Sequence, residues 1–115
     1  YVMLGFNVCA AETDDEATYL KSSGLQALIN LRSGNPGPLP APIRDFEKNL
    51  CGVEKQLVSQ SKSASSTGAM SKIREDVSNF ISHTQADELI ITSQIFEHSA
   101  RVRSYEITQE ACLGL

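Results

Sequence analysis

The stretch Tyr1–Ala17, YVMLGFNVCAAETDDEA, decides the fold. Tyr1–Ala10 is a nearly continuous apolar run with β-branched and aromatic side chains, which is typical of a strand buried on both faces of a parallel sheet. Thr13–Glu16 follows as a capping box, in which the Thr13 hydroxyl and the Glu16 carboxylate satisfy free amides of a first helical turn. A strand, a short loop and a capped helix form one βα unit. Because the run has no start signal, we expect further chain upstream of it.

The apolar pattern of the remaining chain predicts three more helices and one more strand. The first helix continues to about Gly34, and Ile43–Gln60 is weakly helical. A helix ending near Thr84 carries the candidate core residues Ile73, Val77, Phe80 and Ile81. Ala86–Ile95 predicts a second buried strand. The last helix runs from Glu97 or His98 to about Glu110, with the candidate packing residues Val102, Tyr105 and Ile107.

Two segments are predicted to lack regular structure. Residues 33–42 contain every proline of the chain, so we expect a stiff linker there. Residues 59–67 are predicted to form a Ser-rich loop or a poor strand, because burying them would leave hydroxyls and the Lys62 ammonium without partners. Strands that alternate with helices indicate an α/β fold with a parallel sheet and helices on its outside. Residues 1–115 are expected to form a single, partial domain.

Composition excludes several classes of protein. The chain has ten Lys and Arg residues and fourteen Asp and Glu residues, and its basic residues form no stripe of the kind that a nucleic-acid-binding protein carries. No apolar stretch is long enough for a membrane span, and the absence of a leader pattern predicts a cytoplasmic protein. Cys9, Cys51 and Cys112 are odd in number and far apart, which fits neither a disulfide framework nor a metal site.

The sequence contains no motif that identifies a catalytic residue. No Gly-rich phosphate loop, zinc-binding HExxH pattern or GxSxG nucleophile motif occurs, so we predict no catalytic and no metal-binding residue. His83 is best explained as a favourable charge near a helix carboxyl terminus. His98 follows a strand end, where α/β enzymes place working groups, and a catalytic role is its less favoured interpretation.

Three stretches resemble the bacterial luciferase-like monooxygenases. Tyr1–Ala17 resembles a late strand and capped helix of that family, Ala86–Ile107 resembles its extreme carboxyl terminus, and Leu31–Pro40 resembles a linker in one of its branches. The family's members are flavin-dependent oxidoreductases with a TIM-barrel fold, which takes roughly 250 residues. The resemblance therefore implies the C-terminal third of a (β/α)8 barrel, with two parallel strands and outer helices.

Residues 61–71 depart from the family pattern. At this place the family has an apolar strand followed by a Gly-Ser-Pro-Glu helix start. Here Gly68 is kept, but the capping Ser, the Pro and the acidic residue are missing, and the strand is diluted with Ser and Lys. The departure puts the seventh barrel strand in doubt.

The resemblance implies part of an enzyme that uses reduced FMN and O2 on a small organic substrate. The family's catalytic and flavin-contacting residues lie largely on earlier strands, so none is carried over to this chain. By position at strand ends, the candidate pocket-rim residues are Ala11, Glu12, Gly68, Gln94 and Phe96. The alternative is that these residues merely finish strands and cap helices.

The fragment alone is expected to be inactive and not to hold FMN. An incomplete barrel leaves strand edges unpaired, so we expect a homo-oligomer or association with the missing N-terminal part. The alternative function is that of a non-catalytic remnant or interaction module derived from the same fold.

Overall fold

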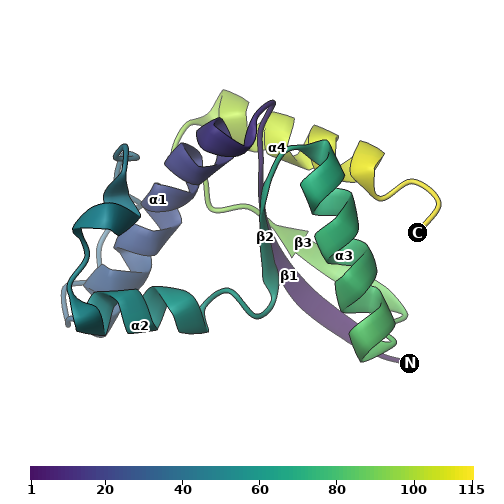
Figure 1. The fold of residues 1–115 in the computed structure, drawn as a ribbon, viewed down its shortest axis with the longest axis horizontal. Coiled ribbons are helices and arrows are strands. Elements are labelled where there is room, and N and C mark those ends of the chain that lie inside the picture. The colour runs from purple at the N-terminus through teal and green to yellow at the C-terminus, as the bar shows by residue number, and fades with distance from the viewer.

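The chain folds around a small parallel sheet (Figure 1). The computed structural model describes all residues, 1–115. No helix in it is both long enough and apolar enough to cross a membrane. In chain order the elements are β1 (Met3–Ala10), α1 (Asp14–Arg32), the 3-10 helix η1 (Phe46–Asn49), α2 (Gly52–Gln60), β2 (Ser65–Gly68), α3 (Met70–Thr84), β3 (Glu88–Thr92) and α4 (His98–Ala111).

The sheet has three parallel strands in the order β2-β1-β3. The second half of β1 pairs with β2, from Asn7 opposite Ser65 to Ala10 opposite Gly68. The first half pairs with β3, from Met3 opposite Glu88 to Asn7 opposite Thr92. The parallel direction of β1 and β3 was predicted, but their direct pairing was not, and the expected total of two strands is wrong by one. Because all strands run the same way, their carboxyl ends lie at one edge of the sheet.

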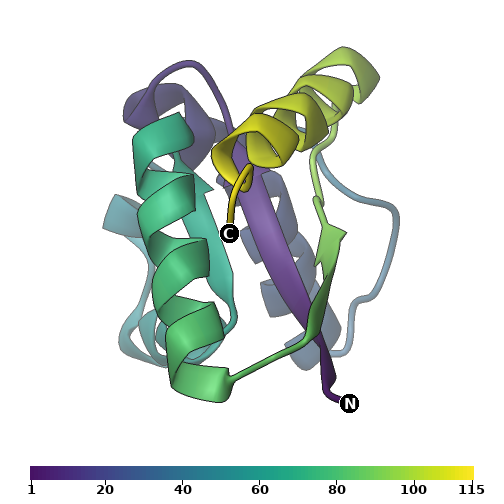
Figure 2. The ribbon, with the colours of Figure 1, turned by 90° about the vertical axis from the view of Figure 1, so that its right-hand side faces the viewer.

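Helices cover both faces of β1, as Figure 2 shows with α3 and α4 on the near side and α1 on the far side. Strand side chains alternate between faces, so Phe6, Val8 and Ala10 point together. They form one core cluster with residues of α3 and α4: Ile73, Val77, Ile107 and Ala111. On the other face Cys9 packs against Ala17 and Leu20 of α1.

The two-sided covering departs from the expected outer helices. The connection from β1 to β2 runs in one direction across the sheet, and the connection from β2 to β3 runs back past β1. Because crossovers between parallel strands are right-handed, connections in opposite directions place their helices on opposite faces.

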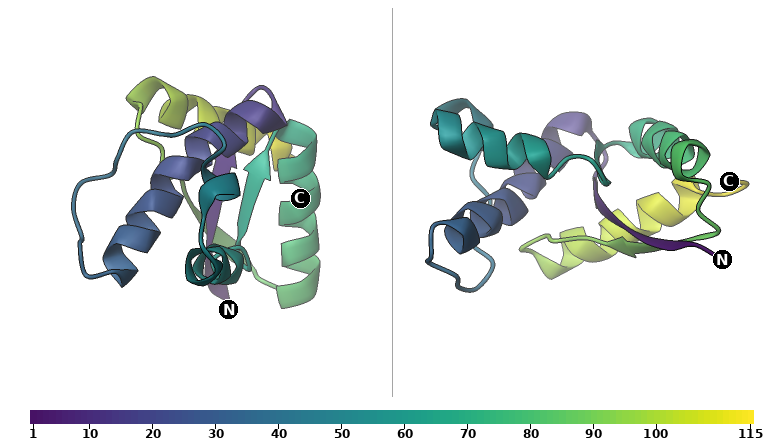
Figure 3. Two further views of the ribbon diagram at one scale, coloured as in Figure 1. Left: turned by 60° about the vertical axis from the view of Figure 1, so that its left-hand side comes forward. Right: turned by 90° about the horizontal axis from the view of Figure 1, so that it is seen from below.

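A third cluster joins α1 to α2. Leu25 and Ile29 of α1 contact Val58 of α2, with Phe46 and Leu50 around them. Figure 3 shows this helix pair at the end of the molecule that lies away from both termini. Residues 33–42, the proline-rich segment, contain neither strand nor helix.

The prediction of a Ser-rich loop or a poor strand over residues 59–67 agrees with much of that segment, because residues 61–64 form turns and β2 is a strand of only four residues at the edge of the sheet. Ser59 and Gln60 end α2, and Ser65–Thr67 belong to β2. The polar groups that were expected to lack partners have them: the Ser66 hydroxyl donates to Asp76 at 2.6 Å, and Lys62 pairs with Glu47 at 3.1 Å. Backbone pairing with β1 then makes a strand of a segment that has almost no apolar side chains.

Two expectations about burial also need correction. Both strands were predicted to be buried on both faces, yet the Met3 side chain of β1 is 50% exposed and the Ile90 side chain of β3 is 51% exposed. In α4 Ile107 is buried as predicted, whereas Val102 and Tyr105 are exposed. The other buried residues of α4 are Ala111 and two small hydroxyl residues, Ser104 and Thr108, which apolar periodicity does not detect.

Thr13 caps α1 as predicted, because its hydroxyl accepts a hydrogen bond from the Glu16 amide at 3.2 Å, but the second half of the predicted capping box, a bond from the Thr13 amide to the Glu16 carboxylate, does not form. Replacing Thr13 by alanine leaves that amide without its protein partner, so the free energy of unfolding should fall by about 1 kcal/mol. Urea unfolding followed by circular dichroism measures the loss, and Thr13→Ser should restore most of it. Equal stability of the alanine variant and the parent chain would show that this cap contributes nothing.

Candidate functional site

The carboxyl ends of β1 and β2 meet closely. The Ala11 amide donates to the Gly68 carbonyl at 3.2 Å, and Ala11 is buried. A Cβ on Gly68 would lie 2.8 Å from Asp14 Oδ1, so no side chain fits there without movement. Asp14 Oδ1 in turn accepts from the Ala69 amide at 2.7 Å, which caps α3 from a neighbouring helix. Ala11 and Gly68, two of the five predicted rim residues, are therefore neighbours in a tightly packed region at the strand ends.

The other three predicted rim residues point to different places. The Glu12 carboxylate pairs with Arg103 Nε at 2.7 Å on α4. The Gln94 side chain packs against Gly24 of α1, and Phe96 is 51% exposed. None of the five lines either of the two principal pockets. Their assignment as a pocket rim stays a prediction.

These residues do not fit FMN within this chain. An isoalloxazine ring needs an extended apolar slot, and a cofactor pocket is predominantly apolar with a few placed polar groups. The larger pocket of the chain has only three hydrophobic residues among the fifteen that line it. No step of flavin chemistry can be assigned to groups of this segment.

The histidine and cysteine side chains form no reactive cluster. His98 Nδ1 lies 2.8 Å from Arg101 Nη2, and burial raises the pKa of the Cys9 thiol to about 11, which keeps it protonated. All three cysteines are free. No group of three or more potential metal ligands occurs.

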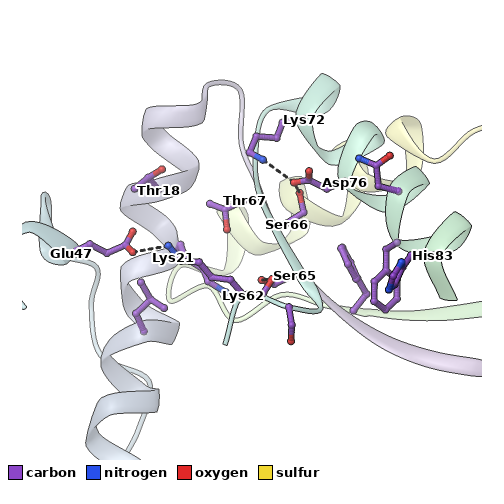
Figure 4. A pocket seen from close by; sticks show the side chains of 15 residues that line it. Thr18, Lys21, Glu47, Lys62, Ser65, Ser66, Thr67, Lys72, Asp76 and His83 are labelled. Atoms are coloured by element: carbon purple, nitrogen blue, oxygen red, sulfur yellow. Dashed lines mark hydrogen bonds and ion pairs between the residues drawn. The ribbon is translucent and has the colours of Figure 1, made fainter. Parts of the chain in front are cut away.

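The larger pocket lies at the outer edge of β2, between α1 and α3 (Figure 4). We call it the β2-edge pocket; its volume is about 630 Å3. Polar side chains predominate in its lining. Its residues are Phe6, Thr18, Lys21, Leu25, Glu47, Lys62, Ser63, Ser65, Ser66, Thr67, Lys72, Asp76, Asn79, Phe80 and His83.

Two of the three lysines in the β2-edge pocket are neutralised by carboxylates. Lys62 pairs with Glu47 at 3.1 Å, and Lys72 pairs with Asp76 at 2.9 Å. The hydrogen bond to Asp76 raises the pKa of Lys72. The third, Lys21, has no carboxylate within ion-pair distance.

The charge of Lys21 is poorly compensated. Burial lowers the pKa of its ammonium and Lys62 lowers it further, while Cys9 and Glu47 act in the opposite direction. The sequence reasoning missed this residue, although a signal for it exists. Lys21 follows buried Ala17 by four residues and precedes buried Leu25 by four, so it lies on the core-facing side of the helix.

Comparison with known proteins identifies the chain's relatives. No family model matches the chain. It is 34% identical over 110 residues to a luciferase-like monooxygenase of Escherichia coli (strain K12). The matched residues cover 96% of this chain and 33% of that protein. It is also 34% identical over 107 residues to the uncharacterized protein YvbT of Bacillus subtilis (strain 168), covering 93% of this chain and 32% of YvbT.

The fold has a counterpart among solved structures. The crystal structure of apo-MsnO8 matches 95% of this chain with a TM-score of 0.72, at 22% sequence identity and over 33% of the MsnO8 chain. The chain thus spans about a third of the length of the curated relatives it matches. It is homologous to luciferase-like monooxygenases over about a third of their length.

Proposed function

We propose that this chain is the C-terminal barrel segment of a flavin-dependent luciferase-like monooxygenase and is inactive by itself. One observation carries the proposal: 34% identity extends over 96% of the chain but reaches only a third of the relative. In such enzymes reduced FMN activates O2, while the protein binds, orients and excludes water. The part played by this segment is to supply barrel wall and covering helices. The substrate would be a small organic molecule.

Uncovered apolar side chains support an incomplete assembly. Met3 and Ile90 lie on the same face of the sheet, because Ile90 is opposite Gly5 in the pairing register, and each is about half exposed. Helix α1 covers this face only near Cys9 and Ala11. The outer edges of β2 and β3 also have no strand partner. These features favour association with the remaining part of the barrel.

A titration with FMN tests the proposal. We expect the 115-residue chain to show no saturable change in flavin fluorescence at micromolar protein, because its polar pocket offers no slot for the ring. The catalytic loops of a barrel come from many strands, and most of them are absent from this segment. Stoichiometric binding by the chain alone would contradict the proposal.

The second candidate is a non-catalytic interaction module. It is favoured by the three core clusters that the chain closes from its own residues. Addition of a complementary N-terminal fragment discriminates the two candidates. Recovery of flavin binding on addition supports the enzyme segment, whereas its failure with a folded, associating pair supports the module.

A further inference from the structure

Residues 41–44, which we call the strap, lie along the outside of α1. In the left view of Figure 3 the chain leaves the end of α1 and returns along the helix. Three contacts attach the strap: Gln26 Nε2 donates to the Ala41 carbonyl at 2.9 Å, the Ile43 amide donates to Ser22 Oγ at 2.8 Å, and Arg44 Cζ lies 4.2 Å from the centre of the Tyr19 ring. Because the strap residues and their partners follow each other in opposite order, the strap runs antiparallel to the helix.

The lengths of the strap and of the helix segment beneath it match. Tyr19 and Gln26 are separated by about 10 Å at the rise of an α-helix. Ala41 and Arg44 are also separated by about 10 Å if the chain between them is extended. Pro42 favours that extended form, so less conformational entropy is lost when the strap docks.

The strap covers the outer face of α1 and does not touch the sheet. Ala17 and Leu20 are on the inner face of the helix, where they pack with Cys9 of β1. Ser22 and Gln26 lie roughly 140° and 180° around the helix from Ala17, at 100° per residue. Because no strand edge takes part in the three contacts, they do not depend on whether the sheet is complete.

The strap is followed by a short apolar segment that also lies against α1. Phe46 and Leu50, in and next to η1, pack around Leu25 and Ile29 of the helix. Both side chains are only half-buried, and η1 has no buried residue. Few buried apolar contacts are typical of a segment that opens while the rest of a protein stays folded.

The position of Arg44 is not explained by an ion pair. No carboxylate lies within ion-pair distance of its guanidinium. A guanidinium over an aromatic ring is attracted by the negative face of the ring. At an exposed site this attraction changes an opening equilibrium by about threefold.

We propose that residues 41–50 form a flap that opens and closes on α1 as one unit, with Arg44 on Tyr19 as its latch. The closed flap covers the side of the helix that carries Leu25 and Ile29. The open flap uncovers that apolar side, while the core cluster of β1, α3 and α4 stays packed. Gly34, with a φ of 81°, is the hinge at one end, and the prolines between it and the strap form a stiff arm. This device goes beyond the proposed flavin function and does not rest on it.

Amide hydrogen exchange of the 15N-labelled chain, followed by NMR without denaturant, tests the proposal. The flap reporters are the amides of Ile43 and Lys48, which donate to Ser22 Oγ and to the Asp45 carbonyl. The core reference is the Asn7 amide, which donates to the Ala64 carbonyl. After correction for intrinsic rates, we expect both flap amides to exchange at least about tenfold faster than the core amide.

Arg44→Met removes the cation and keeps an aliphatic side chain of similar length. It should accelerate exchange at Ile43 and at Lys48 by the same factor, about threefold, without changing the rate at Asn7. Arg44→Lys should keep part of the protection. Arg32→Met, at an exposed arginine in the last turn of α1, is the matched control and should exchange as the parent does at the flap.

Several outcomes would overturn the proposal. These are flap amides that exchange no faster than the core amide, no acceleration by Arg44→Met, equal acceleration by Arg32→Met, or acceleration at Ile43 without Lys48. Equal acceleration at Asn7 would also overturn it, because the substitution would then act on global unfolding. If Arg44→Met loses the dispersed spectrum of a folded chain, Arg44→Gln replaces it, and unchanged flap exchange in that variant has the same meaning.

Discussion

Replacing Ile73 by alanine is expected to lower the free energy of unfolding by about 3–4 kcal/mol. The Ile73 side chain is completely buried, in the cluster that joins β1 to α3 and α4. Its truncation removes apolar surface from the core and leaves a cavity within that cluster. Urea unfolding followed by far-UV circular dichroism measures the difference, with the m-value showing whether unfolding stays two-state.

Val53→Ala is the matched control for this substitution. Val53 is also an aliphatic residue in a helix, but it is 70% exposed, so its truncation should change stability by less than about 0.5 kcal/mol. A loss at Ile73 no larger than the loss at Val53 would contradict the position of α3 against the sheet.

Replacing Ser104 by alanine should cost about 1–3 kcal/mol, although the change is conservative in size. The Ala10 amide donates to Ser104 Oγ at 2.9 Å, and Ser104 Oγ lies 3.1 Å from Ser93 Oγ. Ser93 Oγ donates to the Val8 carbonyl at 2.7 Å, which leaves Ser104 as the donor between the two serines. Without this hydroxyl the Ala10 amide has no partner in a fully buried site.

Ser23→Ala provides the control, since Ser23 is equally buried but its hydroxyl has no hydrogen-bond partner. Removing an unsatisfied hydroxyl should leave stability unchanged or raise it slightly. Thermal unfolding of both variants beside the parent decides the matter. If Ser23→Ala destabilises the chain as much as Ser104→Ala does, packing and not the hydrogen-bonded chain of serines explains the loss.

The sequence predicts the elements whose apolar pattern and capping residues agree. For β1 and α1, an apolar run ends three residues before a threonine cap, and the structure confirms both the strand and the cap. Ile73 and Val77 lie at helical spacing and are buried as predicted. In each case local propensity and burial favour the same conformation.

The sequence predicts β2 only as a loop or a poor strand, because the partners of its polar groups come from distant segments. Asp76 lies ten residues after Ser66, and Glu47 lies fifteen residues before Lys62. Only the folded chain brings these groups together. Transfer energies assigned to Ser and Lys alone therefore favour a loop, whereas paired groups allow a strand.

The β2-edge pocket also could not be predicted from the sequence. Its lining comes from β1, α1, η1, α3 and the segment around β2, and no motif spacing connects these elements. The one local signal was a lysine on the buried side of α1. Conversely, the predicted rim residues were chosen by their place at strand ends, and the structure brings only Ala11 and Gly68 together.

The most direct test of the central claim is a chimera in which this chain replaces the matching 110 residues of the E. coli luciferase-like monooxygenase. The measurement is an FMN titration of the chimera and of its parent under the same conditions. If the chain is a segment of that enzyme fold, the chimera folds and binds FMN within about tenfold of the parent's affinity, a difference of about 1.4 kcal/mol. A folded, monodisperse chimera that has lost the flavin binding of its parent would contradict the account.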